Sequence, residues 1–357
     1  MLLSQLKAIK NQRGRAEQHP YDQIPCNETS DAEKLCREPV VSVMVLAFNH
    51  EKYIRECLDS LVAQIADFPY EIVIGEDCST DRTREICFEY QKRFPDKIRV
   101  LWSEENLYSY NGNELRTRYK CRGEYVTYCE GDDYYTDPRK LQKQVDLIRR
   151  ADAVMCVAFT DWVYSDHTVR STYGGGTKGP DGILYLTVED FKRHYFHTTT
   201  YLMRRDAFLS LDTRFPRMVS LNDTQVEFCL ATLGKVVLLP EVVTVYRWSG
   251  EGVASRLNKI GESHFHLRMF TELYFHGPES QRAYFARAML DSVDWVFMVN
   301  RRYRPTPLTA AEFVEVLKVR RWVLRNIKND LRPSIKYYCE YCLSVGLYLI
   351  KRLLGWA

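Results

Sequence analysis

From Val40 onward the chain alternates between short apolar runs and longer segments whose apolar residues recur at helical spacing. Five runs rich in β-branched residues predict buried strands, and they span 40–46, 71–74, 98–102, 125–129 and 153–159. Between these runs, apolar residues at helical spacing predict helices at 53–62, 81–94 and 138–150. This alternation predicts an α/β fold with a mostly parallel sheet and helices on both of its faces.

The rest of the chain departs from this alternation. Residues 1–38 are polar and mixed, and we expect a loosely ordered leader. Within 161–258 the pattern predicts short helices at 202–211 and 223–233 and strands at 236–239 and 242–246, and the region after 259 reads as helical. The helices expected there are 281–299, 310–327 and 335–354. We therefore expect a leader (1–38), an α/β domain (39–258, divided near 160) and a helical C-terminal region (259–357).

Charge and composition narrow the class of protein. The formal net charge of +3 argues against a dedicated nucleic-acid binder. Residues 301–357 nevertheless hold 12 Lys/Arg and 4 Asp/Glu, a net charge of +8. The helix expected at 335–354 is aromatic, flanked by basic residues and too short to cross a bilayer, so it predicts either peripheral contact with an anionic membrane or packing against protein, a second subunit of a homo-oligomer included.

The expected location is the cytoplasm, at the inner face of the cell membrane. The first apolar stretch is too short for a secretory signal, and the chain has no run of 18 apolar residues. Eleven scattered cysteines fit reduced thiols better than a disulfide framework.

Two of the predicted strands end in acids. Glu76 and Asp77 follow one strand, and Glu130, Asp132 and Asp133 follow another. Three carboxylates within four residues raise one another's pKa values, and a divalent cation removes that penalty. Mg²⁺ and Mn²⁺ prefer oxygen ligands and bind one or two carboxylates together with substrate phosphates. These acids therefore predict a site for Mn²⁺ or Mg²⁺ and a diphosphate; the alternative is a solvated turn that caps the helix after Pro138.

Three sequence blocks resemble the signatures of the family 2 glycosyltransferases. They are VVSVMVLAFNHEKYIRECLDSLVAQ, YEIVIGEDCSTDRT and GEYVTYCEGDDYYTDPRKLQKQV, within residues 40–160, and a fainter similarity continues to about residue 256. The resemblance implies a Rossmann-like GT-A fold, here followed by a C-terminal helical extension. It also implies a nucleotide-diphosphate sugar donor, expected to be a UDP-sugar, a divalent metal, and inversion at the anomeric carbon.

Matching this chain to the family's blocks assigns the donor side. The donor-binding positions are Leu46, Ala47, Phe48, Asn49, Glu76, Asp77, Glu130, Asp132 and Arg247. By resemblance the first four residues cradle base and ribose, the Glu76–Asp77 pair reads the base, and Asp132 and Asp133 bind the metal. The chain differs at Glu130, where the family has Asp, and at Leu46 and Phe48, where many members have Thr and Tyr.

The resemblance also assigns the acceptor side. Asp223, preceded by Asn222 in an acidic-pair position at the start of a helix, corresponds to the general base; the alternatives are that it only caps its helix, or that Glu227 is the base. His197 and Thr198 resemble the segment that lines the sugar and acceptor, although a lone histidine is often structural. In a loop resembling Y-R-x-H-x-G-G, Arg247 faces phosphate or forms a surface ion pair, and Ser249 stands at the His position.

These observations predict an inverting glycosyltransferase that moves a sugar to a glycan or lipid-linked acceptor in surface polysaccharide or glycoconjugate synthesis. A non-catalytic nucleotide-sugar-binding or scaffold protein of the same fold is the alternative. A nucleotidyltransferase is disfavoured, because LAFNHEKY after the first strand has no Gly-rich loop.

Overall fold

The chain folds into two compact units. The computed structural model describes residues 2–12, 23–107, 112–164, 166–167, 169–171, 173–218, 222–248, 259–302 and 310–327. One unit comprises residues 17–214 and 219–249 and contains the sheet; the other comprises residues 1–16, 215–218 and 250–357 and is helical where it is described. We describe each unit by itself.

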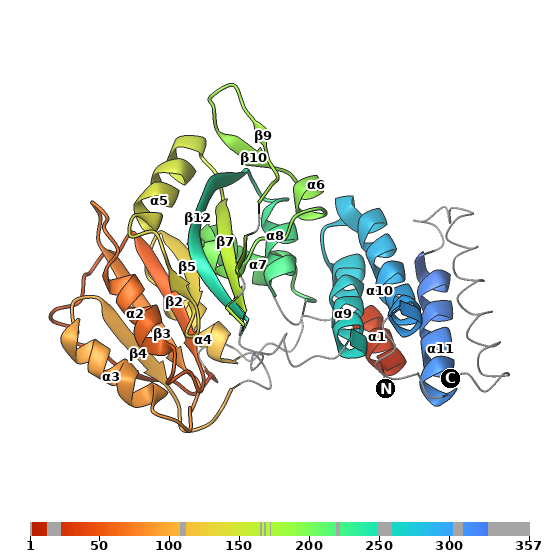
Figure 1. The fold of residues 1–357 in the computed structure, drawn as a ribbon, viewed down its shortest axis with the longest axis horizontal. Coiled ribbons are helices and arrows are strands. Elements are labelled where there is room, and N and C mark those ends of the chain that lie inside the picture. The colour runs from red at the N-terminus through yellow and green to blue at the C-terminus, as the bar shows by residue number, and fades with distance from the viewer. Residues whose placement is uncertain are drawn as a thin grey trace. The chain divides into compact units, whose positions relative to one another are not determined.

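Four parallel strands form the first half of the sheet, and Figure 1 shows them side by side. Their spatial order is β4 (Ile98–Trp102), β3 (Tyr70–Glu76), β2 (Val41–Ala47) and β5 (Tyr125–Glu130). All of β3 and nearly all of β2 are buried, as expected for apolar strands covered on both faces. The prediction of an α/β fold with a mostly parallel sheet is confirmed in this part.

Helices cover both faces of these strands. Val41, Val43 and Val45 share one core cluster with α2 (Ile54–Val62), α3 (Thr83–Arg93) and α5 (Lys140–Ala151). Side chains alternate along a strand, so Gly75 points to the other face, where α4 (Gly112–Lys120) packs closely. A Cβ on Gly75 would lie 2.1 Å from the Thr117 hydroxyl, so this position admits only glycine.

The register of the parallel strands brings their carboxyl ends to one edge. Leu46 pairs with both Gly75 and Glu130, and Ala47 pairs with Glu76. The loops after β2, β3 and β5 therefore begin next to one another. Ligands of open α/β sheets bind at this edge.

The second half of the sheet contains antiparallel strands. β11 (Leu202–Arg204) runs antiparallel between β5 and β7 (Met155–Tyr164), and β12 (Val236–Trp248) runs parallel to β7. The helix expected from residue 202 starts at Arg205, because the three preceding residues pair with two strands; it is α7 (Arg205–Arg214). The smaller elements are β6 (Tyr134–Tyr135), β8 (Val169–Ser171), β9 (Thr177–Lys178), β10 (Leu184–Leu186), α6 (Val188–Phe191), η3 (Thr198–Thr200) and α8 (Asp223–Leu230).

Two segments of the first 38 residues, for which a loosely ordered leader was expected, form regular structure. Residues Leu2–Asn11 form α1, which belongs to the helical unit and contacts α9 (Lys259–His276) and α11 (Ala310–Ile327). Its Leu2 and Leu6, one turn apart, are buried, which explains why a short polar segment becomes ordered. Further along, β1 (Asn27–Thr29) pairs antiparallel with β4.

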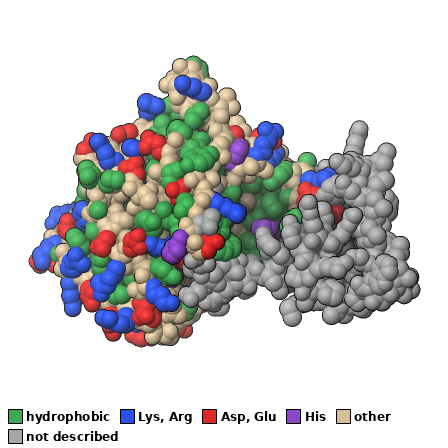
Figure 2. Space-filling model, in the orientation of Figure 1, with side chains coloured by type: hydrophobic (Ala, Val, Ile, Leu, Met, Phe, Trp, Pro, Cys, Tyr) green, Lys and Arg blue, Asp and Glu red, His purple; other side chains and the backbone are tan. Residues whose placement is uncertain are grey.

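The helical unit also contains η4 (Glu279–Gln281) and α10 (Arg282–Arg302), and Figure 1 shows α1 in red beside the blue helices. The helix expected at 335–354 lies outside the described residues. Across the described part of the chain, we find no helix with the length and apolar character needed to span a membrane. On the face shown in Figure 2, acidic and basic side chains are interspersed over the sheet-containing unit, a pattern typical of a solvated surface.

Candidate active site

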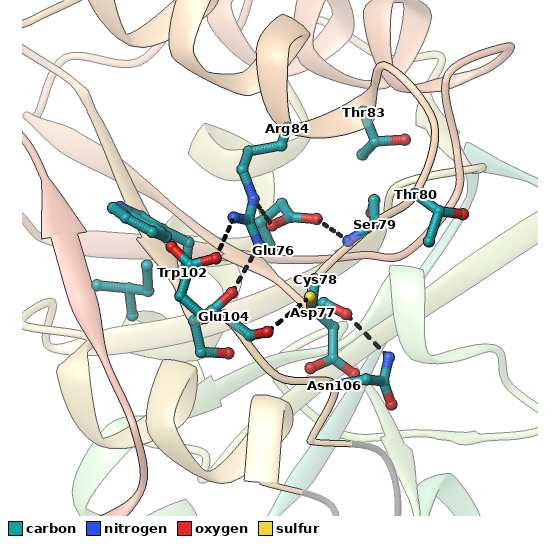
Figure 3. A network of polar contacts seen from close by, with 12 residues as sticks. Glu76, Asp77, Cys78, Ser79, Thr80, Thr83, Arg84, Trp102, Glu104 and Asn106 are labelled. Carbon is teal, nitrogen blue, oxygen red and sulfur yellow. Dashed lines mark hydrogen bonds and ion pairs between the residues drawn. The ribbon is translucent and has the colours of Figure 1, made fainter.

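The acids at the end of β3 are held by the protein's own groups (Figure 3). Glu76 is fully buried; its Oε2 accepts a charged hydrogen bond from Arg84 Nε at 2.6 Å, and its Oε1 accepts the Ser79 N–H at 2.7 Å. Asp77 Oδ1 accepts the Leu107 N–H at 2.8 Å, and burial raises the pKa of its carboxyl. Both oxygens of Glu76 are therefore occupied, one by the loop that follows β3 and the other by Arg84 of α3.

The loop after β2 is tied to the loop after β3 by Asn49. The Asn49 N–H donates to Ser79 Oγ at 3.0 Å, and its side-chain oxygen accepts the Thr80 N–H at 2.8 Å. Asn49 has a φ of 55°, a left-handed conformation that Asn tolerates better than most residues. Of the other expected donor residues in this loop, Ala47 is buried, Leu46 is half-buried, and Phe48 exposes 44% of its surface.

The acids at the end of β5 have a different environment. Asp133 is fully buried; its Oδ1 accepts the Arg247 N–H at 2.8 Å, but its Oδ2 has no hydrogen-bond partner among the residues that the structure describes. Glu130 Oε1 accepts from the Thr198 hydroxyl at 3.0 Å, and Glu130 Oε2 is buried and also unpartnered. Buried polar atoms are normally hydrogen-bonded, so two unpartnered carboxylate oxygens in one place need an explanation.

Burial and the neighbouring negative charges also raise the pKa values of these acids. Burial, reinforced by the charge of Asp132, raises the pKa of Glu130 to about 7. Burial and the charges of Asp132 and Glu130 raise the pKa of Asp133 well above its usual range. Asp132 is more exposed, and its Oδ1 lies 3.9 Å from His50 Nε2. A cation placed here would favour the ionised carboxylates.

His197 lies beside these acids. It is the N-cap residue of η3, and its Nδ1 is 4.0 Å from Asp133 Oδ2. Its ring packs against Tyr246 with a centroid separation of 4.1 Å. Burial lowers the pKa of His197 to about 3, so the imidazole is neutral at physiological pH.

The residues present fit a divalent cation. Ligand atoms of Glu130, Asp133 and His197 all lie within 4.8 Å of one another. Carboxylate oxygens and a neutral imidazole are donors that Mn²⁺ accepts, and the unpartnered oxygens of both acids are available for bonding. The sequence predicted Asp132 and Asp133 as ligands; Asp132 is not in this group and lies next to His50 instead.

Asp223 stands at the first turn of α8, and Asn222 is the N-cap residue. The Asn222 side chain accepts the Gln225 N–H at 3.1 Å in a capping box, so Asn222 stabilises the helix start. Asp223 is not the N-cap residue; its Oδ1 accepts the Thr224 N–H of the first turn at 2.9 Å, and its Oδ2 accepts the Tyr195 hydroxyl at 2.6 Å. Its negative charge contributes to the raised pKa of Glu130, which places the two carboxylates within electrostatic reach of each other.

Glu227, the alternative base, is buried and accepts a hydrogen bond from Tyr201 at 2.6 Å. Burial raises its pKa well above the usual range. A buried, hydrogen-bonded acid next to a core tyrosine is placed to support α8 rather than to meet a substrate.

Arg247 joins the end of β12 to the acidic turn. Its Nη1 donates to the Asp132 carbonyl at 2.7 Å, and its Nη2 pairs with Glu56. The guanidinium also lies 4.6 Å from the ring centroid of Tyr134. This position fits both a surface ion pair and a contact with phosphate, the two roles expected for Arg247, because the ion pair lies beside the acids that a phosphate would approach.

Sequence reasoning did not single out His50, Tyr195 or Tyr246. His50 directly follows Asn49 in the first sequence block, so its position was a usable signal. Tyr195 precedes His197 by only two residues, so it was within reach of the same reasoning. Tyr246 is brought against the His197 ring only by folding, and its distance along the chain gives no comparable signal.

Comparison with known proteins identifies the domain. Residues 42–211 match the family model described as Glycosyl transferase family 2. This part of the chain is therefore a family 2 glycosyltransferase domain, and the resemblance of the three sequence blocks is confirmed.

Relatives of known sequence match parts of the chain. An uncharacterized protein of Mycobacterium tuberculosis is 33% identical over 220 residues, which are 60% of each chain. The chain thus spans about three-fifths of that relative's length. The poly(ribitol-phosphate) beta-N-acetylglucosaminyltransferase TarS of Staphylococcus aureus is 38% identical over 191 residues, which are 52% of this chain and 29% of TarS.

A solved structure shares the fold. The mannosyltransferase PcManGT from Pyrobaculum calidifontis, solved in complex with GDP-Man and Mn²⁺, superposes with a TM-score of 0.50 over 99% of this chain and 90% of its own. Its sequence is 17% identical, so the similarity concerns the fold alone. The expected GT-A fold is confirmed.

Proposed function

We propose that this protein transfers a sugar from a nucleoside-diphosphate donor, a UDP-sugar, to a hydroxyl of a glycan or lipid-linked acceptor with inversion of configuration. The observation that carries the proposal is the pair of buried carboxylate oxygens on Glu130 and Asp133 that have no hydrogen-bond partner among the described residues, with the half-buried Asp223 within electrostatic reach of Glu130. An acid cluster that the fold leaves unneutralised needs a cationic ligand, and a nucleotide diphosphate supplies the remaining ligands of Mn²⁺ or Mg²⁺.

Asp133 would hold the cation from inside the turn. Asp132, the other acid that the sequence predicted as a ligand, lies outside the group of Glu130, Asp133 and His197 and would add its negative charge from the more exposed side. By resemblance Glu130 contacts the ribose, but one of its carboxylate oxygens lies within 4.8 Å of the Asp133 and His197 ligand atoms, so we assign it to the cation. When bound, the divalent cation neutralises the charge that grows on the departing diphosphate. Arg247, beside Asp132, would contribute a second positive charge on the same side.

Asp223 would act as general base. Its carboxylate accepts the Tyr195 hydroxyl, which holds Oδ2 in one orientation and leaves lone pairs for an acceptor hydroxyl. As that hydroxyl attacks the anomeric carbon, Asp223 would take its proton. His197, Thr198 and Asn222 lie at the ends of η3 and α8 that border this carboxylate and Glu130, and they would line the sugar and acceptor pocket.

The donor base would lie along the loops after β2 and β3. Phe48 is the exposed ring of the first loop, and the loop is fixed by Leu46, Ala47 and Asn49. Asp77 would accept from the ring N–H of a uracil-like base. Glu76 would act through Arg84, since its two oxygens are already bound to Arg84 of α3 and to the Ser79 N–H.

The acceptor class is proposed from the relatives. TarS is named as a poly(ribitol-phosphate) beta-N-acetylglucosaminyltransferase, and its match covers 52% of this chain. We propose surface polysaccharide or glycoconjugate synthesis in the cytoplasm as the setting. A scaffold that binds the nucleotide sugar without transferring it is the competing function.

A transfer and hydrolysis assay with a panel of nucleotide sugars and Mn²⁺ tests the proposal. We expect turnover with a UDP-sugar, and a loss of about 10²–10⁴-fold in Asp223→Asn, because proton removal by a positioned base contributes on that order. The affinity for UDP with Mn²⁺ should stay within about twofold in this variant. UDP-sugar binding without turnover by the wild type would favour the scaffold.

A further inference from the structure

An imidazole faces the unpartnered oxygens of the acidic turn. We propose that His197 is a direct ligand of the divalent cation, and that Glu130, Asp133 and His197 together form its protein-side coordination. The inference rests on the proposed function, since it concerns the same cation. It adds a nitrogen ligand from η3 that the acidic strand end does not provide.

The distances support coordination by small adjustments of the side chains. An octahedral ion with ligands at about 2.1 Å holds neighbouring ligand atoms about 3 Å apart and opposite ones about 4 Å apart. His197 Nδ1 and Asp133 Oδ2 are 4.0 Å apart, and all three residues place a ligand atom within 4.8 Å of the others. Rotations about χ2 of His197 and χ3 of Glu130 close a difference of this size.

The hydrogen bonds around the site leave these ligand atoms for a cation. Asp133 Oδ2 and Glu130 Oε2 are buried without partners. The Thr199 N–H reaches His197 Nδ1 at 3.4 Å, which is longer than a normal N–H hydrogen bond. The Thr199 hydroxyl, 2.9 Å from Nδ1, has a second acceptor in Thr244 Oγ1 at 3.1 Å, so it keeps a partner when Nδ1 binds a metal.

The surroundings hold the imidazole in place. Tyr246 packs on the ring, and Thr244 continues the hydroxyl chain to Thr160 at 2.8 Å. The other carboxylate oxygen of each acid is held by a hydrogen bond: Glu130 Oε1 accepts from the Thr198 hydroxyl, and Asp133 Oδ1 accepts from the Arg247 N–H. Outer partners of this kind orient metal ligands, and they make the site preorganised on the protein side.

Pulsed electron paramagnetic resonance of the protein with Mn²⁺ and UDP tests this inference without measuring activity. We expect ¹⁴N modulation from a directly bound imidazole in the wild type, and its disappearance when all histidines carry ¹⁵N. The modulation should vanish in His197→Asn and persist in His194→Asn, a histidine three residues away that contacts Gly174 and Gly175. Mn²⁺ affinity should fall about tenfold or more in His197→Asn.

Each other result overturns the inference. Mn²⁺ bound without imidazole modulation in the wild type would leave the proposed function intact and refute the role of His197. Modulation that survives in His197→Asn and vanishes in His50→Asn would identify His50, which lies beside Asp132, as the nitrogen ligand and would refute the role of His197. Absence of Mn²⁺ binding in the presence of UDP would contradict both this inference and the proposed function. If His197→Asn does not fold, the wild-type and His50→Asn spectra still decide.

Discussion

The acids that follow β3 and the acids that follow β5 look alike in sequence and differ in the folded protein. Glu76 is buried with Arg84 at one oxygen and a backbone N–H at the other. Asp133 is buried just as completely, yet one of its oxygens has no partner. The first strand end supplies a counter-charge at the carboxylate itself, whereas at the second no described residue donates a hydrogen bond to Asp133 Oδ2 or Glu130 Oε2.

This difference separates a supporting acid from a ligand-binding acid. A paired buried carboxylate stabilises the loop it belongs to, and removing its charge leaves a guanidinium without a partner. An unpaired buried carboxylate destabilises the fold until a ligand arrives. Burial and acidity alone therefore do not identify a ligand-binding acid. Whether each carboxylate oxygen has a hydrogen-bond partner within the protein is the better guide.

The largest expected effect is on metal binding and turnover. Asp133→Asn should lower turnover by at least about 10²-fold, because the departing diphosphate loses its electrostatic stabilisation. Glu76→Gln, the matched loss of a buried charge at the other strand end, should leave Mn²⁺ affinity within about twofold. Calorimetric titration of Mn²⁺ in the presence of UDP, alongside the transfer assay, measures both quantities. Equal losses of Mn²⁺ affinity in the two variants would remove the distinction between the two strand ends.

A smaller effect of opposite sign is expected for the free energy of unfolding without metal. Glu76→Gln should lower it by about 1–3 kcal/mol, since Arg84 loses its charged partner. Asp133→Asn should raise it at pH 8, because Asn keeps the Oδ1 acceptor for the Arg247 N–H and removes a buried carboxyl that resists ionisation.

The pH dependence of stability follows from the same raised pKa. Folding raises the pKa of Asp133, so the native metal-free protein binds more protons than the unfolded chain. The contribution of Asp133 to the free energy of unfolding therefore falls as pH rises above about 4. Urea denaturation at pH 5 and pH 8 should show the gain from Asp133→Asn mainly at pH 8. A gain that is the same at both pH values, or a loss at pH 8, would contradict the assignment of Asp133 as an uncompensated acid.

Local sequence patterns were sufficient for the parallel half of the sheet. The apolar run at 98–102 is β4, and the run at 125–129 is β5 with one further residue, because a strand buried on both faces must be apolar throughout. The parallel arrangement then places the acids of β3 and β5 at one edge. The existence of an acidic site could be predicted from these facts alone.

Contacts distant in sequence could not be predicted in the same way. Glu76 is neutralised by Arg84 on the next helix, and either residue alone would have looked like an ordinary surface charge. His197 approaches Asp133 because β11 is inserted antiparallel between β5 and β7. A strand of three residues is too short to be predicted from its sequence pattern. The short helix at 2–11 is ordered by α9 and α11, which are distant in sequence, a pairing with no local signal.

Anomalous diffraction at the manganese edge, from crystals grown with UDP and MnCl₂, tests the central claim most directly. The account predicts one strong peak between the carboxylates of Glu130 and Asp133, with none at Glu76 and Asp77. A manganese ion bound at the β3 acids, or UDP bound with the β5 acids free of metal, would contradict it.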